Sequence, residues 1–203
     1  MWCGKNDRGG DYHHGGLRQA LIDYAVGRVR ADGVGAFSMR EAARAAGVSS
    51  GAAYRHFSEK DALLIAVAQE GFSLLAQKAA RASAGKSGPE KLKALGEAYI
   101  TFASDDPNLF RLMFSQMCMG AAKAAGPKDP TVPTAFDQLR EALAEVTGTS
   151  SSEVDESLMA VAWSTAHGAA SLICDGVWTK DDPRAQAAMA EIGRIAQSRI
   201  KKP

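Results

Sequence analysis

The sequence predicts an all-α protein, and three observations support that prediction. Alanine-rich segments carry apolar residues at helical spacing, and aromatic residues make up only 7 % of the chain. No stretch alternates apolar and polar residues with the β-branched enrichment of a strand. Six of the seven prolines fall between the apolar-periodic segments, where they separate helices. We therefore expect helices joined by turns, arranged as an N-terminal three-helix domain and a C-terminal helical bundle.

Four helices are expected in the N-terminal part. The first covers residues 16–31 and stops at the turn pair Asp32-Gly33. Two short helices follow at 39–46 and 50–57; Ser38, with Glu41 three residues later, forms a capping box before the first of them. A long fourth helix is predicted over 59–82, before a segment rich in Gly and Ser.

Five more helices are expected in the C-terminal part. Asp106-Pro107 and Asp182-Pro183 each place a capping carboxylate before a proline in the first helical turn. Residues 120–133 are punctuated by Gly and Pro and are predicted to form a loop. The five helices are predicted at 90–104, 107–120, 134–147, 153–178 and 183–200.

Composition excludes several classes of protein. The 24 basic residues nearly balance 23 acidic ones, so any nucleic-acid binding requires a local basic surface. Cys3, Cys118 and Cys174 lie far apart without CxxC spacing, which disfavours a disulfide framework or a zinc site and suits a reducing cytoplasm. Residues 158–174 lack Asp, Glu, Lys and Arg, but the segment is short for a membrane span and contains polar residues. We expect a buried helix there, a cytoplasmic protein, and no membrane partner.

The two short helices have the anatomy of a helix-turn-helix. Gly47 suits a left-handed turn, Val48 can pack into the core, and Ser49 can cap the second helix. Small residues such as Ala43 and Ala53 allow the two helices to cross closely. In such a motif the second helix enters the DNA major groove. A surface hairpin without a ligand has the same spacing and stays open at this point.

The residues around this turn match a known family. The segment from Ser38 to Ser49 reads SMREAARAAGVS, and YRHFSEKDAL follows from Tyr54. These match S/T-x-R-x-x-A-x-x-A-G-V-S and Y-x-H-F-x-x-K-x-x-L, so the chain resembles the TetR family of bacterial transcriptional regulators over roughly residues 12–70. A shorter match, Trp163 with His167-Gly168, resembles the Trp…His-Gly signature of one class of effector domain in that family.

The resemblance implies a division of the chain into three regions. We expect a flexible N-terminal arm over residues 1–15, a DNA-binding domain with the helix-turn-helix over 16–62, and a ligand-binding and dimerisation domain over 63–203.

Phosphate and base contacts are assigned to the helix-turn-helix. Tyr54 and His56 can donate to phosphate oxygens, and Lys60 can share a phosphate with the N-terminus of its helix. The residues expected to face the bases, Ser50, Gly51 and Ala52, are small and can make few hydrogen bonds to base edges. DNA shape therefore has to supply much of the specificity. Each basic residue, taken alone, is equally consistent with a solvent-exposed helix face that binds no DNA. The predicted DNA-contacting residues are Ser38, Arg40, Ser49, Ser50, Gly51, Ala52, Tyr54, Arg55, His56 and Lys60.

An effector site is predicted from Met and aromatic side chains in the C-terminal part. Trp163 and His167 are four residues apart, which places them on one helix face. Such side chains also fill ordinary cores, and the imidazole can bond a neighbouring side chain or a ligand. The predicted pocket residues are Tyr99, Phe102, Phe110, Met113, Phe114, Met117, Trp163 and His167.

The last two helices are predicted to form a dimer interface. The final helix has one apolar stripe, and the helix before it has a face of small residues. Two such helices can pack against their symmetry mates as a four-helix interface. The predicted interface residues are Gly168, Ser171, Met189, Ile192 and Ala196.

Together these features predict a ligand-responsive DNA-binding regulator. We expect a homodimeric repressor that leaves a palindromic operator when a small apolar or amphipathic effector binds; activation instead of repression stays open. No cofactor, metal site or catalytic residue is expected. Two alternatives are a helical partner-binding protein without DNA binding and a helical enzyme. The enzyme lacks motif support, because Gly85-Lys86-Ser87 has no upstream strand or matching glycine.

Overall fold

The computed structural model describes residues 14–125 and 131–200 of the 203-residue chain. Within those residues the regular structure is helical throughout, as predicted. The predicted N-terminal arm lies outside the described residues, apart from the first residues of α1. The α-helices are α1 His14–Asp32, α2 Met39–Ala45, α3 Ser50–His56, α4 Lys60–Ser83, α5 Gly88–Asp105, α6 Pro107–Met113, α7 Gln116–Ala125, α8 Ala135–Thr147, α9 Glu156–Cys174 and α10 Pro183–Ser198. Two 3-10 turns, Val34–Ala36 and Ser151–Glu153, complete the set.

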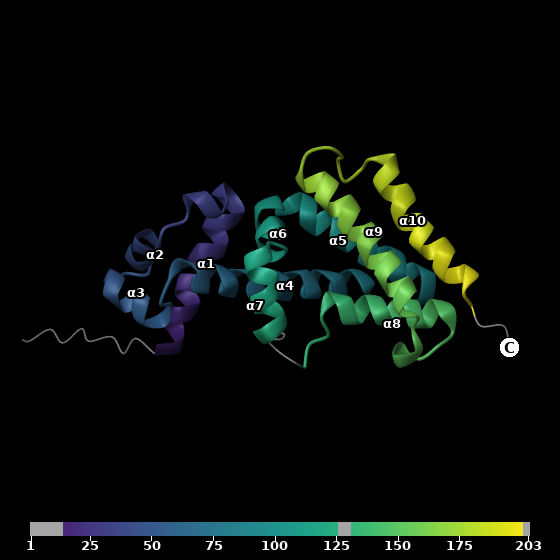
Figure 1. The fold of residues 1–203 in the computed structure, drawn as a ribbon, viewed down its shortest axis with the longest axis horizontal. Helices are drawn as coiled ribbons and strands as arrows, with labels where there is room; N and C mark the ends of the chain where they lie inside the picture. Colours follow the sequence, from purple (N-terminus) through teal and green to yellow (C-terminus); the bar gives the residue numbers. More distant parts are fainter. Residues whose placement is uncertain (1–13, 126–130, 201–203) are drawn as a thin grey trace, which may run out of the picture.

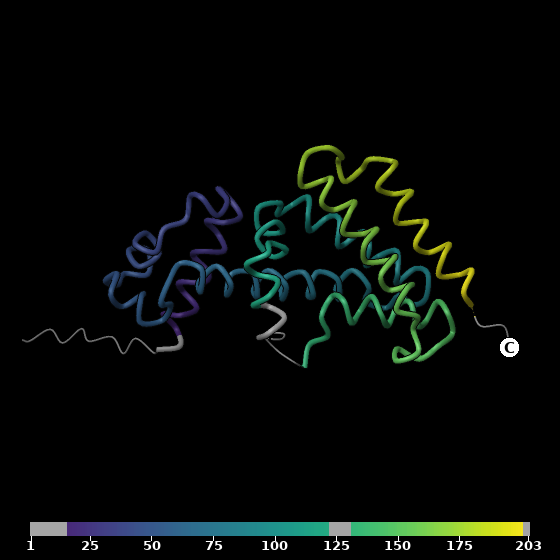
Figure 2. The backbone as a smooth tube through the Cα atoms, viewed as in Figure 1, coloured from purple at the N-terminus to yellow at the C-terminus, as the bar shows by residue number. Residues whose placement is uncertain are grey.

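The helices form an elongated molecule with two ends (Figure 1). The short helices α2 and α3 lie with α1 at one end, and α5, α8, α9 and α10 gather at the other. Figure 2 shows the backbone of α4 running without a break from the first group to the second. Helices α6 and α7 stand between the two groups, where α6 packs against α1 and α4.

The helix-turn-helix is built by local capping. The Ser38 hydroxyl accepts a hydrogen bond from the Glu41 N–H, and the Ser49 hydroxyl accepts one from the Ala52 N–H, both at 3.3 Å. Gly47 takes a left-handed φ of 71°, which a residue with a side chain rarely adopts. The turn then closes through the Val48 N–H, which donates to the Ala43 carbonyl at 2.9 Å. The predicted caps of both short helices are therefore confirmed.

The apolar core continues from the N-terminal helices into the middle of the molecule. One cluster joins Leu21 of α1 and Leu63 of α4 with Leu109 of α6 and Cys118 of α7. A second cluster joins α5, α8, α9 and α10. Helix α9 is long and apolar enough to cross a membrane, but its buried face packs into this second cluster, as in the core helix of a folded domain.

Two differences from the predicted helices have local causes. The segment predicted as one helix over 107–120 is two helices, because Ser115 interrupts it: its hydroxyl donates to the Leu112 carbonyl at 2.8 Å and accepts from the Cys118 N–H. The predicted loop over 120–133 is helical as far as Ala125, since Gly120 is followed by a run of strong helix formers. The rest of that loop lies partly outside the described residues.

Candidate nucleic-acid interface and ligand site

The outer face of α3 carries most of the predicted DNA-contacting residues. Ser50, Gly51, Tyr54 and Arg55 are exposed, and Tyr54 has 47 % of its surface accessible. Ala52 is half-buried, and Ala53 points into the core with no exposure. Because α3 lies at one extremity of the molecule, this face is free to approach a long, straight ligand (Figure 1).

The remaining predicted contacts lie at the start of α2 and at the two ends of α3. Arg40 on α2 is exposed, and His56 at the end of α3 is half-buried. Ser38 and Ser49 use a hydroxyl lone pair for capping, which leaves their O–H free to donate. These residues therefore keep donors, and in Arg40 a positive charge, at the surface of the helix-turn-helix.

Lys60 has a structural role that the sequence did not reveal. Its ammonium donates to the Val34 carbonyl at 3.1 Å and lies 5.7 Å from the centre of the Phe37 ring. These contacts tie the start of α4 to the turn that precedes α2. An ammonium has three N–H donors, so the side chain keeps donors for a phosphate while it holds this turn.

His167 is the centre of a cluster of aromatic rings, hereafter the aromatic cluster. The Tyr99 hydroxyl lies 2.9 Å from His167 Nδ1. Phe110 stacks on the imidazole with ring centres 5.5 Å apart, and Phe114 meets it edge-on at 4.5 Å. Trp163 lies 5.8 Å away on the same helix. Five of the eight predicted pocket residues therefore meet around one imidazole.

Burial sets the protonation states in the aromatic cluster. It raises the pKa of the Tyr99 phenol well above its usual range and lowers the pKa of the His167 imidazole. The phenol therefore keeps its proton, and the imidazole is neutral near pH 7. A neutral imidazole carries one N–H donor and one acceptor nitrogen, so His167 presents a hydrogen-bonding group among aromatic walls.

Three predicted pocket residues lie elsewhere. Phe102 and Met113 are buried in the core that α4 and α6 share with α1, and Met113 packs closely on Gly71. Met117 is partly exposed on α7. The pocket assignment of Phe102 and Met113 stays a prediction, because helical spacing of apolar residues does not distinguish a pocket wall from an ordinary core.

Two members of the aromatic cluster were missed. The ring of Phe136 meets Trp163 edge-on at 6.3 Å between centres, and the ring of Phe72 meets Phe114 at 5.4 Å. Phe136 follows the cap residue Thr134 at the start of α8, and 43 % of its surface is exposed. The sequence signal that could have identified Phe136 is an aromatic residue in the first turn of a predicted helix.

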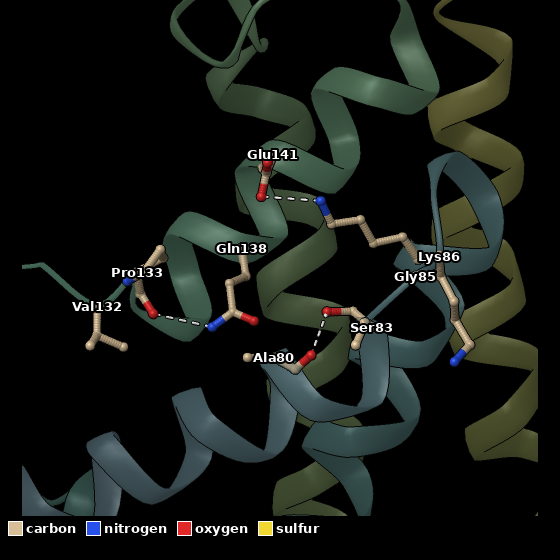
Figure 3. Close-up of a pocket in the computed structure, with 10 residues that line it drawn as sticks. Ala80, Ser83, Gly85, Lys86, Val132, Pro133, Gln138 and Glu141 are labelled. Atoms are coloured by element: carbon tan, nitrogen blue, oxygen red, sulfur yellow. Dashed lines mark hydrogen bonds and ion pairs between the residues drawn. The ribbon is translucent and has the colours of Figure 1, made fainter.

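The rings of the aromatic cluster are in contact with one another. Two surface hollows, with volumes of about 330 and 270 Å³, lie along α4, the larger of them in Figure 3, and neither is lined by a ring of the cluster. Within the described residues, no three His, Cys, Asp or Glu side chains are grouped to hold a metal ion.

The predicted dimer interface divides into exposed and buried residues. Gly168 is exposed on α9, and Ser171 and Met189 are half-buried. The prediction for Ile192 and Ala196 is wrong, because these side chains are 5 % and 0 % exposed within the chain's own core. The apolar stripe of α10 thus packs onto neighbouring helices of the same chain and is not left exposed for a second chain.

Comparisons with known proteins agree with this architecture. The family described as "Bacterial regulatory proteins, tetR family" matches residues 21–67, and "Tetracyclin repressor-like, C-terminal domain" matches residues 92–193. A protein of unknown function from Rhodococcus sp. RHA1 is 26 % identical, with a TM-score of 0.67 over 95 % of this chain and 100 % of its own.

Two further solved structures have the same fold. A TetR family transcription regulator from Marinobacter aquaeolei VT8 is 20 % identical, with a TM-score of 0.59 over 88 % of this chain and 94 % of its own. RolR, solved in complex with the ligand resorcinol, is 16 % identical, with a TM-score of 0.62 over 94 % of this chain and 95 % of its own. The C-terminal family match alone spans half of the sequence, and the N-terminal match covers the helix-turn-helix: the chain belongs to the TetR family of bacterial regulatory proteins.

Proposed function

We propose that the chain is a homodimeric, cytoplasmic repressor that binds a palindromic operator through α3 and leaves it when a small apolar or amphipathic effector enters the aromatic cluster. The observation that carries the proposal is the path between the two sites. Helix α6 packs against α1 and α4 and places Phe110 against His167. One short helix therefore contacts both α1, which packs against the helix-turn-helix, and the candidate effector site.

The outer face of α3 suits close approach to the major groove. Ser50 and Gly51 at its start are small, so the helix backbone can come near the base edges. Tyr54 and Arg55 extend farther and can reach phosphate oxygens on either side. With few side chains able to read a base, operator choice depends largely on DNA shape and on the spacing of two half-sites.

The aromatic cluster suits a flat effector with one polar group. Phe110, Phe114 and Trp163 offer ring faces and edges, and the neutral His167 imidazole offers a ring nitrogen for a hydrogen bond. The similar protein RolR binds resorcinol, an aromatic ligand, which supports an aromatic-walled site in this fold. We assign the effector domain to the Trp…His-Gly class on the strength of Trp163, His167 and Gly168.

Displacement of a ring provides the switch. An effector that pushes Phe110 or Phe114 aside moves α6 against α1 and α4, which changes the separation of the two α3 helices in the dimer. Such an effector must bind the DNA-incompetent state more tightly, since equal affinity for both states shifts nothing.

Dimerisation is assigned to the exposed face of α9. Val161 and Gly168 lie on that face, which has no Asp, Glu, Lys or Arg between Ser157 and Cys174. Regulators of this family are in general DNA-binding proteins without catalysis, and the proposal gives no residue a catalytic role.

The proposal is tested by selecting an operator from a random DNA library and measuring its affinity by fluorescence anisotropy. Tyr54→Phe removes one hydroxyl from an exposed side chain, so we expect a two- to tenfold loss of affinity for all sequences, about the free energy of one hydrogen bond. Tyr24→Phe on α1 is the matched control and should bind as the wild type. Failure to enrich any DNA sequence would contradict the proposed function.

Release is tested with the same operator. Compounds that raise the melting temperature in a metabolite screen should weaken operator binding when added at saturation. A set of stabilising compounds that all leave anisotropy unchanged would contradict the proposed switch.

A further inference from the structure

Arg18, near the start of α1, is stacked on a ring at the junction of α3 and α4. Its guanidinium carbon lies 4.9 Å from the centre of the Phe57 ring. Phe57 is the residue directly after α3, and only 3 % of its surface is exposed. Figure 1 shows the first turns of α1 beside the connection between α3 and α4. Arg18 is not among the residues predicted to contact DNA, but the fold brings its guanidinium to the end of α3.

The stacked guanidinium keeps all of its hydrogen-bond donors. A guanidinium stacks on an aromatic ring through its face, whereas its five N–H groups point outward in its own plane. Arg18 is exposed, and its guanidinium forms no hydrogen bond or ion pair with any residue that the structure describes. Its donors are therefore free to bind a group outside the chain.

The side chains around the junction suit a phosphate group. Tyr54 is exposed and His56 half-buried in the last turn of α3, and Lys60 is the first residue of α4. Lys60 is partly occupied by its contacts with the turn before α2, whereas the donors of Arg18 are unoccupied. Glu59 is exposed in the same connection but forms no ion pair with Arg18 among the described residues, so the positive charge is not neutralised there.

The position of this charge fits the edge of the major groove. The groove is about 12 Å wide and a helix with its side chains about 10 Å across, so groups at the end of a helix in the groove lie near the flanking phosphates. Arginine suits such a phosphate because two of its N–H groups can bind two phosphate oxygens at once.

We propose that Arg18 binds a phosphate of the DNA backbone at the end of α3, and that Phe57 orients the guanidinium for this contact. The proposal rests on the proposed binding of DNA through α3. Because the side chain is already stacked on a buried ring, less conformational entropy is lost when DNA arrives. A phosphate contact carries no base information, so Arg18 contributes equally to the binding of every DNA sequence.

The salt dependence of DNA binding separates this contact from a purely structural role. Each phosphate contact steepens the plot of log affinity against log salt concentration by about 0.9, through counterion release. Arg18→Met removes the charge and keeps an unbranched side chain that can still cover Phe57. In anisotropy titrations of the full chain, we expect the slope to become shallower by about 1 for each bound subunit. Affinity should fall roughly tenfold for each lost contact, on the selected operator and on an unrelated duplex alike.

Two further variants complete the design. Arg81→Met is the matched control, because Arg81 is exposed in the last turn of α4, far from the helix-turn-helix, and its loss changes the net charge equally. It should keep the wild-type slope and affinity. Arg18→Lys keeps the charge but not the two-point geometry, so it should keep the slope and bind about threefold more weakly.

A wild-type slope in the Arg18→Met protein would overturn the proposal. If its melting temperature falls at the same time, Arg18 serves only to cover Phe57. An equal loss of slope in Arg81→Met would also overturn it, since the effect would then reflect net charge alone. Arg18→Gln removes the same charge and provides the same test if Arg18→Met does not fold. Wild-type and Arg81→Met proteins that both fail to bind DNA would instead contradict the proposed function itself, which distinguishes that failure from the loss of this one contact.

Discussion

Arg30 at the end of α1 and Asp106 at the start of α6 form a two-point ion pair. Arg30 Nη2 donates to Asp106 Oδ2 at 2.9 Å, and Nε donates to Oδ1. The carboxylate is largely buried, with 11 % of its side chain exposed. Asn108 on α6 adds a hydrogen bond to the Arg30 carbonyl at 3.3 Å. Helix α1 of the DNA-binding domain is thereby attached to the helix that carries Phe110.

Loss of this ion pair should destabilise the chain measurably. Arg30→Ala leaves the Asp106 carboxylate mostly buried without its partner, so we expect the free energy of unfolding to fall by about 1–3 kcal/mol. Arg28→Ala is the matched control, because Arg28 pairs with Asp32 on the surface of the same helix, where such pairs contribute about 0.5 kcal/mol or less. Urea unfolding followed by circular dichroism gives both values. Equal losses in the two variants would mean that the Asp106 pair behaves as a surface pair.

The close approach of α4 and α6 depends on Gly71. A Cβ atom at this position would lie 2.6 Å from Sδ and 2.8 Å from Cγ of Met113, whose side chain is fully buried. We expect Gly71→Ala to lower the free energy of unfolding by about 1–3 kcal/mol, despite alanine's better helix propensity.

Gly27→Ala is the control for this prediction. Gly27 lies on the exposed side of α1, and an added Cβ would meet nothing within 4 Å. That variant should become more stable by up to about 1 kcal/mol, through helix propensity alone. Thermal and urea unfolding of both variants measure the contrast; a stabilised Gly71→Ala protein would show that α6 is free to shift.

The lowered pKa of His167 predicts a specific pH dependence of stability. In the unfolded chain the imidazole takes up a proton near pH 6.5, whereas in the folded chain it does so only at lower pH. Between these two pH values the unfolded state binds more protons, so the free energy of unfolding falls as the pH drops below 6.5.

His167→Asn removes this contribution and keeps a polar group near Tyr99. Unfolding measured from pH 5 to pH 7.5 should show a smaller loss of stability below pH 6.5 in the variant than in the wild type. Parallel curves for the two proteins would contradict a half-buried imidazole that stays neutral near pH 7.

Interface and core residues on the last two helices should respond differently to a charge. Gly168→Glu is sterically free on the exposed face of α9, so it should give a folded protein that is monomeric by light scattering. Ile192→Glu buries a charge in the core of the subunit and should cost roughly 3–5 kcal/mol, so it unfolds the chain instead. A folded, dimeric Gly168→Glu protein would move the interface away from this part of α9.

Local signals explain why most helix starts could be predicted from the sequence. Ser38, Ser49 and Asp182 cap the helices that follow them through hydrogen bonds to N–H groups two or three residues along. Because each cap and its N–H partner are close in sequence, such caps can be predicted from a few consecutive residues. The break at Ser115 was missed because neither Gly nor Pro marks it, and a serine inside an apolar run usually stays within the helix.

The effector site was predictable only in part, since its contacts join distant segments. Trp163 and His167 share a helix face, and four residues of spacing suffice to show it. Phe136 contacts Trp163, which lies 27 residues later in the sequence, and no local sequence pattern predicts that contact. The prediction that Ile192 lies in the dimer interface failed for a related reason. An apolar stripe shows that a helix face is covered, but the covering surface can belong to the same chain or to another.

The unbroken course of α4 bears on how the chain can be divided. Its 24 residues, about 36 Å long, supply Leu63, Leu64 and Val67 to the core beneath the helix-turn-helix, beyond the boundary proposed at residue 62. A fragment cut at that boundary would lose these buried side chains and expose the apolar surface of α1. The shortest piece of the protein that folds and still recognises DNA must therefore retain α4, and with it the docking surface for α6.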